Sequence, residues 1–345
     1  MEENNKNLQD RKKITIDEVA KRAHVSIATV SRIINNKDQV TEKTRQHVLK
    51  VMDEMAFVPK STKALFNATS NVILLLIPDF ENPFNAAIIS GIQESAREHD
   101  MDVFVVQTKN YYTEHRHFIN ILKNNSIAGI IILAPAPHKS LLDELCHSCP
   151  VVMCSEYAED YGVSYVTIND IESAKSAVNY LISTGRRKIG LINSNLKYKY
   201  ARHRERGYKQ ALEAAGLEIN EDFIAHISAI DYSSALSSAT HILGLPNRPD
   251  AFFAVSDVFA TGVIVAAKKL GLKVPEDVSV VGFDNIELSN MTEPPITTIE
   301  QPAHQLGYQA AELLLEKIRK PDMADRQIIL DTHLVVRGST TLSSM

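Results

Sequence analysis

A short outward face near the N-terminus carries the side chains best suited to contact another molecule. It belongs to the second of two predicted helices in the segment TIDEVAKRAHVSIATVSRIIN, and it consists of Ile27, Ala28, Thr29, Ser31 and Arg32. Small side chains allow close approach to the floor of a DNA major groove, hydroxyls reach phosphates, and an arginine can bind guanine through two hydrogen bonds. The pattern indicates a helix that reads DNA, with an ordinary helical hairpin as the alternative.

Capping and periodicity predict the elements that position this face. Thr15 and Glu18 have the spacing of a capping box at the start of a first helix, and Ser26 can cap the second. Thr41 can cap a third helix, and Pro59 ends the module. Apolar residues repeat at helical spacing in all three. They are Ile16, Val19, Ala20 and Ala23, then Val30, Ile33 and Ile34, then Val48, Met52 and Met55.

This N-terminal segment resembles the DNA-binding headpiece of the LacI/GalR family of bacterial transcription regulators nearly position by position. The resemblance depends on Val25-Ser26, Ala28-Thr29-Val30-Ser31-Arg32, Asn35-Asn36, Val40, Thr44-Arg45 and Phe57-Val58-Pro59. It implies a helix-turn-helix headpiece, two copies of which read a palindromic double-stranded operator. The DNA-contacting residues expected there are Thr15, Ser26, Ile27, Ala28, Thr29, Ser31, Arg32 and Asn35. His24 stands where the family usually carries glycine, and it must accept or avoid a left-handed backbone that costs about 1 kcal/mol.

Composition describes an ordinary soluble globular chain of two or three domains. It has 345 residues, 44% hydrophobic and 23% charged, and no run approaches the roughly 20 apolar residues of a membrane helix. The N-terminus MEENNKNLQDRKK lacks the apolar stretch of a secretory signal, so we expect a cytoplasmic protein with no membrane partner. Residues 1–63 contain 13 Lys and Arg against 9 Asp and Glu, although the whole chain has a net charge of −5. A basic head on an acidic body is typical of a protein that touches nucleic acid with one end.

Nothing in the sequence argues for catalysis, a cofactor or a metal. No glycine-rich nucleotide fingerprint, P-loop, G-x-S-x-G or H-E-x-x-H sequence occurs, and no obvious carboxylate pair is present. Cys146, Cys149 and Cys154 are too few for a disulfide framework. The Cys146-x-x-Cys149 spacing lacks the second ligand pair that a zinc site needs.

Residues 1–13 are predicted to be a disordered tail, 14–59 the headpiece and 60–71 a polar linker. In the LacI family this linker forms a hinge helix on DNA, with a leucine wedged into the minor groove. Here Phe66 falls at the wedge position and Leu65 is a second candidate, while Lys60 and Lys63 can contact phosphates. The alternative is a flexible tether without insertion.

From residue 72 apolar strands alternate with amphipathic helices, which indicates parallel sheets covered on both faces. Strands are expected at 72–77, 103–106, 129–133, 151–153, 166–168, 189–192, 251–255 and 278–281. Helices are expected at 83–98, 113–124, 139–147, 170–184, 201–215, 257–270 and 303–319. Two such runs predict two doubly wound subdomains with a ligand pocket between them.

The body also resembles LacI-family effector domains, through Pro78-Asp79, Asn82-Pro83-Phe84, Gly91-Ile92, Gly129-Ile130-Ile131, Gly190, Gly207-Tyr208, Ala211-Leu212, VPEDVSVVGFDN, PPITTIEQP and LVVRGST. The resemblance implies a periplasmic-binding-protein-like effector and dimerisation domain at 72–340. Its subdomains would comprise 72–164 with 296–326 and 165–295 with 327–340, joined by crossovers near 163–166, 290–297 and 325–330. The sequence ends without leucine heptads, so a homodimer is expected.

The resemblance also implies a set of effector-binding residues. They are Phe84, Asn85, Arg204, Ile230, Ser256, Asp257 and Asp284. Asn85 and Ile230 replace residues that are often aromatic in the family. The alternative for Asp284 is a residue that caps the loop after a strand.

The stretch Lys197–Arg204 (KYKYARHR) is unusually basic for the lip of a cleft. It is compatible with an anionic effector, such as a sugar phosphate or nucleotide, or with a solvated face. Met153, Glu156-Tyr157-Ala158, Val178-Asn179-Tyr180-Leu181 and Arg204-x-x-Gly207-Tyr208 look most similar to the family's cytidine repressor branch. A nucleoside is therefore a candidate effector beside a sugar or a sugar phosphate.

Together these features predict a sequence-specific DNA-binding repressor of a catabolic or uptake operon, controlled by a small metabolite and not an enzyme. The alternatives are a free-standing sugar- or nucleoside-binding protein, and an α/β enzyme with an appended helical domain.

Overall fold

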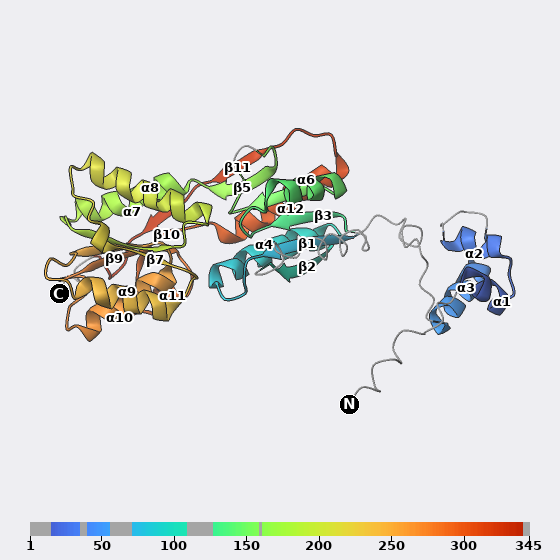
Figure 1. The fold of residues 1–345 in the computed structure, drawn as a ribbon, viewed down its shortest axis with the longest axis horizontal. Helices are drawn as coiled ribbons and strands as arrows, with labels where there is room; N and C mark the ends of the chain where they lie inside the picture. The colour runs from blue at the N-terminus through green and yellow to red at the C-terminus, as the bar shows by residue number, and fades with distance from the viewer. Residues whose placement is uncertain (1–14, 35–39, 56–70, 109–126, 159–160, 341–345) are drawn as a thin grey trace, which may run out of the picture. The chain divides into compact units, whose positions relative to one another are not determined.

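A computed structural model describes residues 15–34, 40–55, 71–108, 127–158 and 161–340. The chain forms two compact units, a headpiece within the first 71 residues and a body that begins at Val72 (Figure 1). The predicted tail, the predicted helix at 113–124, and all of the predicted linker except Asn71 lie outside the described residues. No described helix is long and apolar enough to cross a membrane.

The headpiece contains three helices, α1 (Ile16–Arg22), α2 (Ile27–Ile34) and α3 (Glu42–Glu54). The predicted capping box is confirmed, because the Glu18 N–H donates to Thr15 Oγ1 and the Thr15 N–H donates to Glu18 Oε2 at 2.7 Å. Ser26 Oγ accepts the N–H of Thr29 at the start of α2. The buried residues that close the core are Val19, Ala20, Ala23, Val30, Ile33, Val48, Val51 and Met52.

The turn between α1 and α2 bends at His24. Its φ of 53° is left-handed, a conformation that residues other than glycine and asparagine seldom adopt. The Val25 N–H then donates to the carbonyl of Ala20 at 3.0 Å, which ends α1. The histidine therefore accepts the backbone strain instead of avoiding it.

The body contains two six-stranded sheets. The first has the order β11-β5-β4-β3-β1-β2 and is entirely parallel. Its strands are β1 (Val72–Ile77), β2 (Asp102–Gln107), β3 (Gly129–Ile132), β4 (Val151–Cys154), β5 (Ser164–Ile168) and β11 (Gln327–Leu330). The second has the order β12-β10-β9-β8-β6-β7, with only β12 antiparallel. Its strands are β6 (Ile189–Ser194), β7 (Ile224–Ile227), β8 (Ala251–Ala254), β9 (Ser279–Asp284), β10 (Thr297–Glu300) and β12 (His333–Val335).

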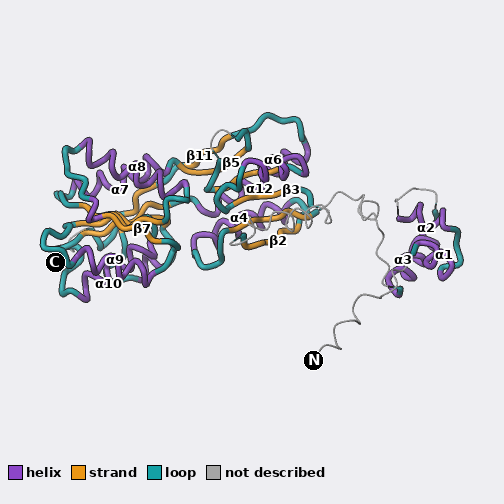
Figure 2. The backbone as a smooth tube through the Cα atoms, in the orientation of Figure 1, coloured by secondary structure: helices purple, strands orange, loops and turns teal. Residues whose placement is uncertain are grey.

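Helices pack against both sheets (Figure 2), whereas edge strands such as β2 and β11 keep exposed positions. The first subdomain contains α4 (Pro83–Glu98), α6 (Lys139–Ser148) and α12 (Ala303–Arg319). The second contains α7 (Asp170–Ser183), α8 (Lys199–Ala214), α9 (Tyr232–Leu243), α10 (Asp257–Lys269) and the short α11 (Leu288–Met291). Around the second sheet, α7 packs on α8 and α9 packs on α10. The doubly wound parallel architecture predicted from the sequence is confirmed.

The chain passes between the two sheets later than the sequence predicted. It leaves the first sheet after Ile168, returns after Glu300, and leaves again after Leu330. The predicted crossovers near 163–166 and 290–297 would assign β5 and β10 to the wrong sheets, and the predicted third boundary, between 326 and 327, would do the same for β11. An apolar strand pattern reveals a buried strand but not the neighbour with which it pairs, which is why these boundaries need correction.

Helices α4 and α12 approach so closely that their glycines are required. A Cβ added to Gly307 would lie 2.0 Å from the carbonyl oxygen of Ile88, and one added to Gly91 would lie 2.0 Å from that of His304. Both neighbours are backbone atoms, which cannot move away like the end of a side chain. The two glycines therefore set the helix–helix distance in the first subdomain.

We expect Gly307→Ala to lower the free energy of unfolding by about 1–3 kcal/mol, because the added methyl overpacks this contact. Urea unfolding followed by circular dichroism measures the change. Gly244→Ala is the matched control, since Gly244 has an ordinary φ of −79° and its nearest carbonyl oxygens would lie 3.3 Å from the new methyl. Equal stability of the two variants would contradict the close-contact argument.

Candidate functional site

One cavity of the body is lined by residues that follow strands of both sheets. Parallel strands present their carboxyl ends at one edge, which is where ligands bind in such folds. The first subdomain contributes Pro78, Asp79, Asn82, Phe84, Asn85, Leu133, Pro135, Ser155 and Glu156. The second contributes Ser194, Tyr198, Tyr200, Arg204, Ile230, Val255, Ser256 and Asp284, and Gln301 comes from the segment that connects them.

Six of the seven predicted effector residues line this cavity, namely Phe84, Asn85, Arg204, Ile230, Ser256 and Asp284. The seventh, Asp257, does not. Its fully buried carboxylate accepts hydrogen bonds from Thr298 Oγ1 at 2.6 Å and from the Ile286 N–H at 2.9 Å. Asp257 therefore lies behind the wall of the cavity and holds the loop that follows β9.

Asn85 and Ser256 line the cavity with groups that already have protein partners. The Asn85 side chain donates to the Asp79 carbonyl at 3.1 Å, and Ser256 Oγ accepts the Phe259 N–H as the N-cap of α10. Asn82 caps α4 in the same way, through the Phe84 N–H. The N-termini of α4 and α10 therefore reach the cavity, one from each subdomain.

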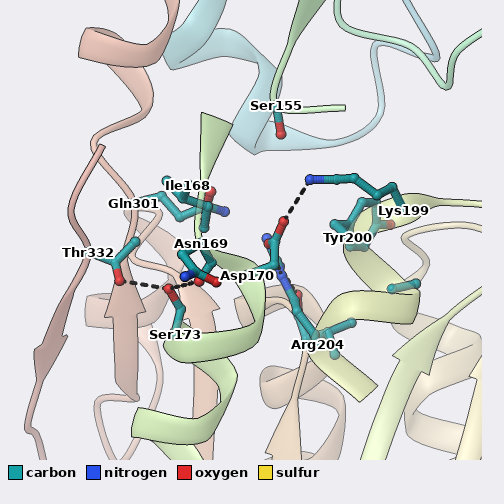
Figure 3. A network of polar contacts seen from close by, with 12 residues as sticks. Ser155, Ile168, Asn169, Asp170, Ser173, Lys199, Tyr200, Arg204, Gln301 and Thr332 are labelled. Atoms are coloured by element: carbon teal, nitrogen blue, oxygen red, sulfur yellow. Dashed lines mark hydrogen bonds and ion pairs between the residues drawn. The ribbon is translucent and has the colours of Figure 1, made fainter. Parts of the chain in front are cut away.

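Asp170 pairs with two buried cations of helix α8 (Figure 3). It lies 2.9 Å from Arg204 Nε and 3.2 Å from Lys199 Nζ, and all three side chains are at most 5% exposed. Burial alone would raise the pKa of Asp170, but the charges of Arg204 and Lys199 lower it below its ordinary value. The carboxylate therefore stays ionised, as a buried group between two cations must.

The guanidinium of Arg204 is held on every side. Its Nη1 donates to the Val255 carbonyl at 2.8 Å and lies 3.7 Å from Asp284 Oδ1. Its Cζ lies 3.6 Å from the centroid of the Phe283 ring and 5.0 Å from that of Tyr200. Ion pair, carbonyl and rings fix a planar donor at the wall of the cavity.

Asp284 and Asp257 hold their protons far more tightly than ordinary aspartates. Burial raises the pKa of Asp284 to about 7, opposed by Arg204 and by a hydrogen bond from Gln301 Nε2. Burial and the neighbouring Asp284 raise the pKa of Asp257 to about 8. A cavity wall with a carboxyl that titrates near neutrality can both accept and donate hydrogen bonds to a hydroxylated ligand.

Glu156 joins the two subdomains. It follows β4, and its buried carboxylate accepts the N–H groups of Lys199 at 2.9 Å and Tyr200 at 3.0 Å in the first turn of α8. Burial raises the pKa of Glu156, against the opposing effects of the Lys199 charge and the two N–H groups. Lys199 Nζ also lies 3.9 Å from the centroid of the Tyr157 ring, which adds a second contact across the cleft.

Sequence reasoning missed several residues of this site. It did not select Asp79, Asn82, Ser155, Glu156, Asp170, Ser194, Tyr198, Tyr200 or Gln301. Asn82, directly before Pro83, has the signature of a helix N-cap and could have been found at a strand end. Asp170 and Glu156 carried no such signal, because their roles depend on a helix far along the chain.

On the headpiece, the predicted recognition face is accessible. Ile27, Ala28 and Arg32 are exposed, Thr29 and Ser31 are half-buried, and the N-terminal Thr15 and Ser26 are exposed. The Thr29 hydroxyl pairs with that of Ser26 at 2.8 Å, so these two also stabilise the helix start. Asn35, Lys60, Lys63, Leu65 and Phe66 lie outside the described residues.

We expect Asp257→Asn to flatten the pH dependence of stability. Unfolded aspartate ionises near a pKa of about 3.9, whereas folded Asp257 keeps its proton up to about pH 8. Its contribution is therefore complete below about pH 4 and declines until about pH 8, by at most about 1.4 kcal/mol per pH unit. Urea unfolding of both proteins from about pH 5 to 8 should show the variant gaining stability relative to the parent.

Asp222→Asn, at an exposed position, is the control for this comparison. The difference between its free energy of unfolding and that of the parent should not change with pH in this way. Parallel pH profiles for the parent and Asp257→Asn would mean that Asp257 is ionised in the folded protein.

Two family models match the chain. "Bacterial regulatory proteins, lacI family" matches residues 15–60, and "Periplasmic binding protein-like domain" matches residues 178–340. The HTH-type transcriptional repressor CytR of Escherichia coli (strain K12) is 34% identical over 328 residues, which cover 94% of this chain and 96% of that protein. The HTH-type transcriptional regulator DegA of Bacillus subtilis (strain 168) is 35% identical over 334 residues, or 95% of this chain and 98% of DegA.

A solved structure gives the same result for the fold. The complex of the transcriptional regulator CelR with cellobiose superposes with a TM-score of 0.72 at 30% identity, covering 94% of this chain and 99% of CelR. The similarity to CytR, DegA and CelR extends over nearly the whole length of each protein, and the chain has a helix-turn-helix headpiece and a two-subdomain body. The chain therefore belongs to the lacI family of bacterial regulatory proteins.

Proposed function

We propose that this transcription regulator is a cytoplasmic homodimeric repressor that binds a palindromic operator. Its affinity for the operator falls or rises when a small metabolite occupies the cavity of its body. The effector is a sugar, a sugar phosphate or a nucleoside, and the regulated genes serve its catabolism or uptake. One observation carries the proposal. A single chain holds both an exposed recognition helix and a cavity that polar and charged side chains of two subdomains help to line.

The cavity lining suits a hydroxylated metabolite. Arg204 supplies a fixed donor and Asp284 a carboxyl beside it, while a buried Gln301 Oε1 has no described hydrogen-bond partner. A buried acceptor without a donor costs free energy, and a ligand hydroxyl or amine would satisfy it. CelR, whose complex contains cellobiose, shares this body architecture, which supports a hydroxylated effector here.

In the proposed mode of action the protein is a dimer and does not act as an enzyme. Two headpieces related by a two-fold axis match the two halves of a palindromic site. A ligand in the cavity changes operator affinity only by binding one arrangement of the subdomains better than another. Turnover of the bound metabolite is not required for this coupling.

Arg32→Ala tests the recognition helix. Loss of a base contact should weaken binding to an operator selected from a random DNA pool by about 1–3 kcal/mol and relax preference at one base pair per half-site. Fluorescence anisotropy with the operator and single-base variants measures this. Arg22→Ala removes an exposed arginine from α1 and should weaken operator and scrambled DNA by similar factors. Undiminished discrimination by Arg32→Ala would assign base reading to other residues.

A thermal-shift screen of nucleosides, sugars and their phosphates tests the cavity, because a ligand of the folded state raises the melting temperature. We expect Arg204→Ala and Asp284→Ala to abolish the shift that the parent protein shows. Arg206→Ala, on the exposed face of the same helix, should keep it. Retention of the shift in both cavity variants would move the effector site elsewhere.

A further inference from the structure

The cations of the basic stretch Lys197–Arg204 are held by other groups of the protein, and among them only Arg204 also lines the cavity. Lys199 pairs with Asp170, and Arg204 pairs with Asp170 and the Val255 carbonyl. Arg202 Nη1 donates to the carbonyls of Leu196 and Lys197 at 2.8 and 3.0 Å. Lys197 Nζ lies 4.9 Å from the centroid of the Tyr198 ring. The basic sequence therefore does not create a basic cavity.

The helix N-termini at the cavity already have protein acceptors, which are Asn82 for α4, Ser256 for α10 and Glu156 for α8. Backbone N–H groups and the helix dipole make the start of a long helix favourable for phosphate. Helix α8 has 16 residues and begins at the cavity, but Glu156 Oε2 and Oε1 take the first two of its N–H groups. An ionised carboxylate accepts hydrogen bonds and donates none, so Glu156 competes directly with a phosphate for these N–H donors.

The charges around the cavity also oppose an anion. The lining contains the acidic groups of Asp79, Glu156 and Asp284 and one basic group, that of Arg204. Since Asp170 and Glu156 together offset the two cations Arg204 and Lys199, a phosphate with a charge near −2 would find no uncompensated positive charge there. Displacing Glu156 would leave its 5%-exposed carboxylate buried without donors, which is costly.

We propose that Glu156 determines the charge of the effector, so that the cavity admits an uncharged, multiply hydroxylated molecule and rejects the phosphorylated form of the same molecule. This inference depends on the proposed effector site and narrows it to free sugars and nucleosides. Glu156 acts by filling the N-terminus of α8 from the opposite subdomain. Its removal opens an anion site where the parent protein has none.

The test uses the full-length protein and two kinds of probe. The first is inorganic phosphate, compared with sodium chloride at equal ionic strength. The second is a set of matched pairs: cytidine, adenosine and ribose, each with its 5′- or 5-phosphate. Melting temperatures and titration calorimetry are measured for the parent, Glu156→Ala and Glu156→Gln, with Glu213→Gln as a control that removes an exposed carboxylate from the same helix.

In the parent and in Glu213→Gln we expect no phosphate-specific rise in melting temperature, and at least a tenfold preference for the neutral member of any pair that binds. Both Glu156 variants should gain a phosphate-specific rise, and the preference should fall at least tenfold or reverse. Glu156→Gln keeps the size and one acceptor of the side chain, so it reports on charge even if Glu156→Ala unfolds.

The inference is overturned if the parent binds a phosphorylated member as tightly as its neutral partner, while the cavity remains an effector site. It is also overturned if the folded Glu156 variants gain no response to phosphate. If no neutral or phosphorylated probe shifts the parent protein, the proposed metabolite classes fail instead, and the phosphate response of the Glu156 variants still decides the role of this residue.

Discussion

The ion pairs of Asp170 with Arg204 and Lys199 tie helix α7 to helix α8 beside the cavity. Charges buried to this degree are tolerated only when each has a close partner, so the first residue of α7 and the first turns of α8 must stay in register. Arg204 then has one available orientation, between the rings of Phe283 and Tyr200. Asp170, which does not line the cavity, therefore fixes the Arg204 donor at its wall. The same carboxylate holds Lys199 away from the ligand space.

Contacts across the cleft depend on that arrangement. Glu156 binds the N-terminus of α8, and Tyr157 lies against Lys199, whose ammonium Asp170 holds in place. The three connecting segments take part as well. Ser173 Oγ donates to the Asn169 carbonyl and pairs with Thr332, which ties the first connection to the third (Figure 3). Gln301 of the second connection donates to Asp284. A ligand group that contacts Asp284 is therefore separated by one hydrogen bond from Gln301, in the second segment that connects the subdomains.

The parts of this fold that local sequence determines were predictable, and the parts that distant pairing determines were not. Helix α4 was predicted at Pro83–Glu98 from its amphipathic pattern, and in the structure Asn82 and Pro83 mark its start. Strands β7, β10, β11 and β12 were missed because short segments such as TTIE and IAHI lack a buried apolar run. Family resemblance predicted seven effector residues; six of them line the cavity, whereas Asp257 lies behind its wall and bonds to Thr298 and Ile286. The basic stretch before Gly207 left two interpretations open, because sequence shows charges but not their partners.

The cross-cleft contacts also constrain how a ligand can control DNA binding. A ligand that binds open and closed arrangements equally well shifts nothing, however tight it is. Effective ligands must therefore contact both subdomains, for example Arg204 on one side and the polar groups around Asn82 on the other. Glu156 and Tyr157 already bridge the two subdomains without a ligand, so an effector acts in addition to these contacts, and couplings between sites are typically about 1–3 kcal/mol. An effector that displaced Glu156 would lose one of these contacts, so the proposed exclusion of anions and the arrangement of the subdomains depend on the same carboxylate.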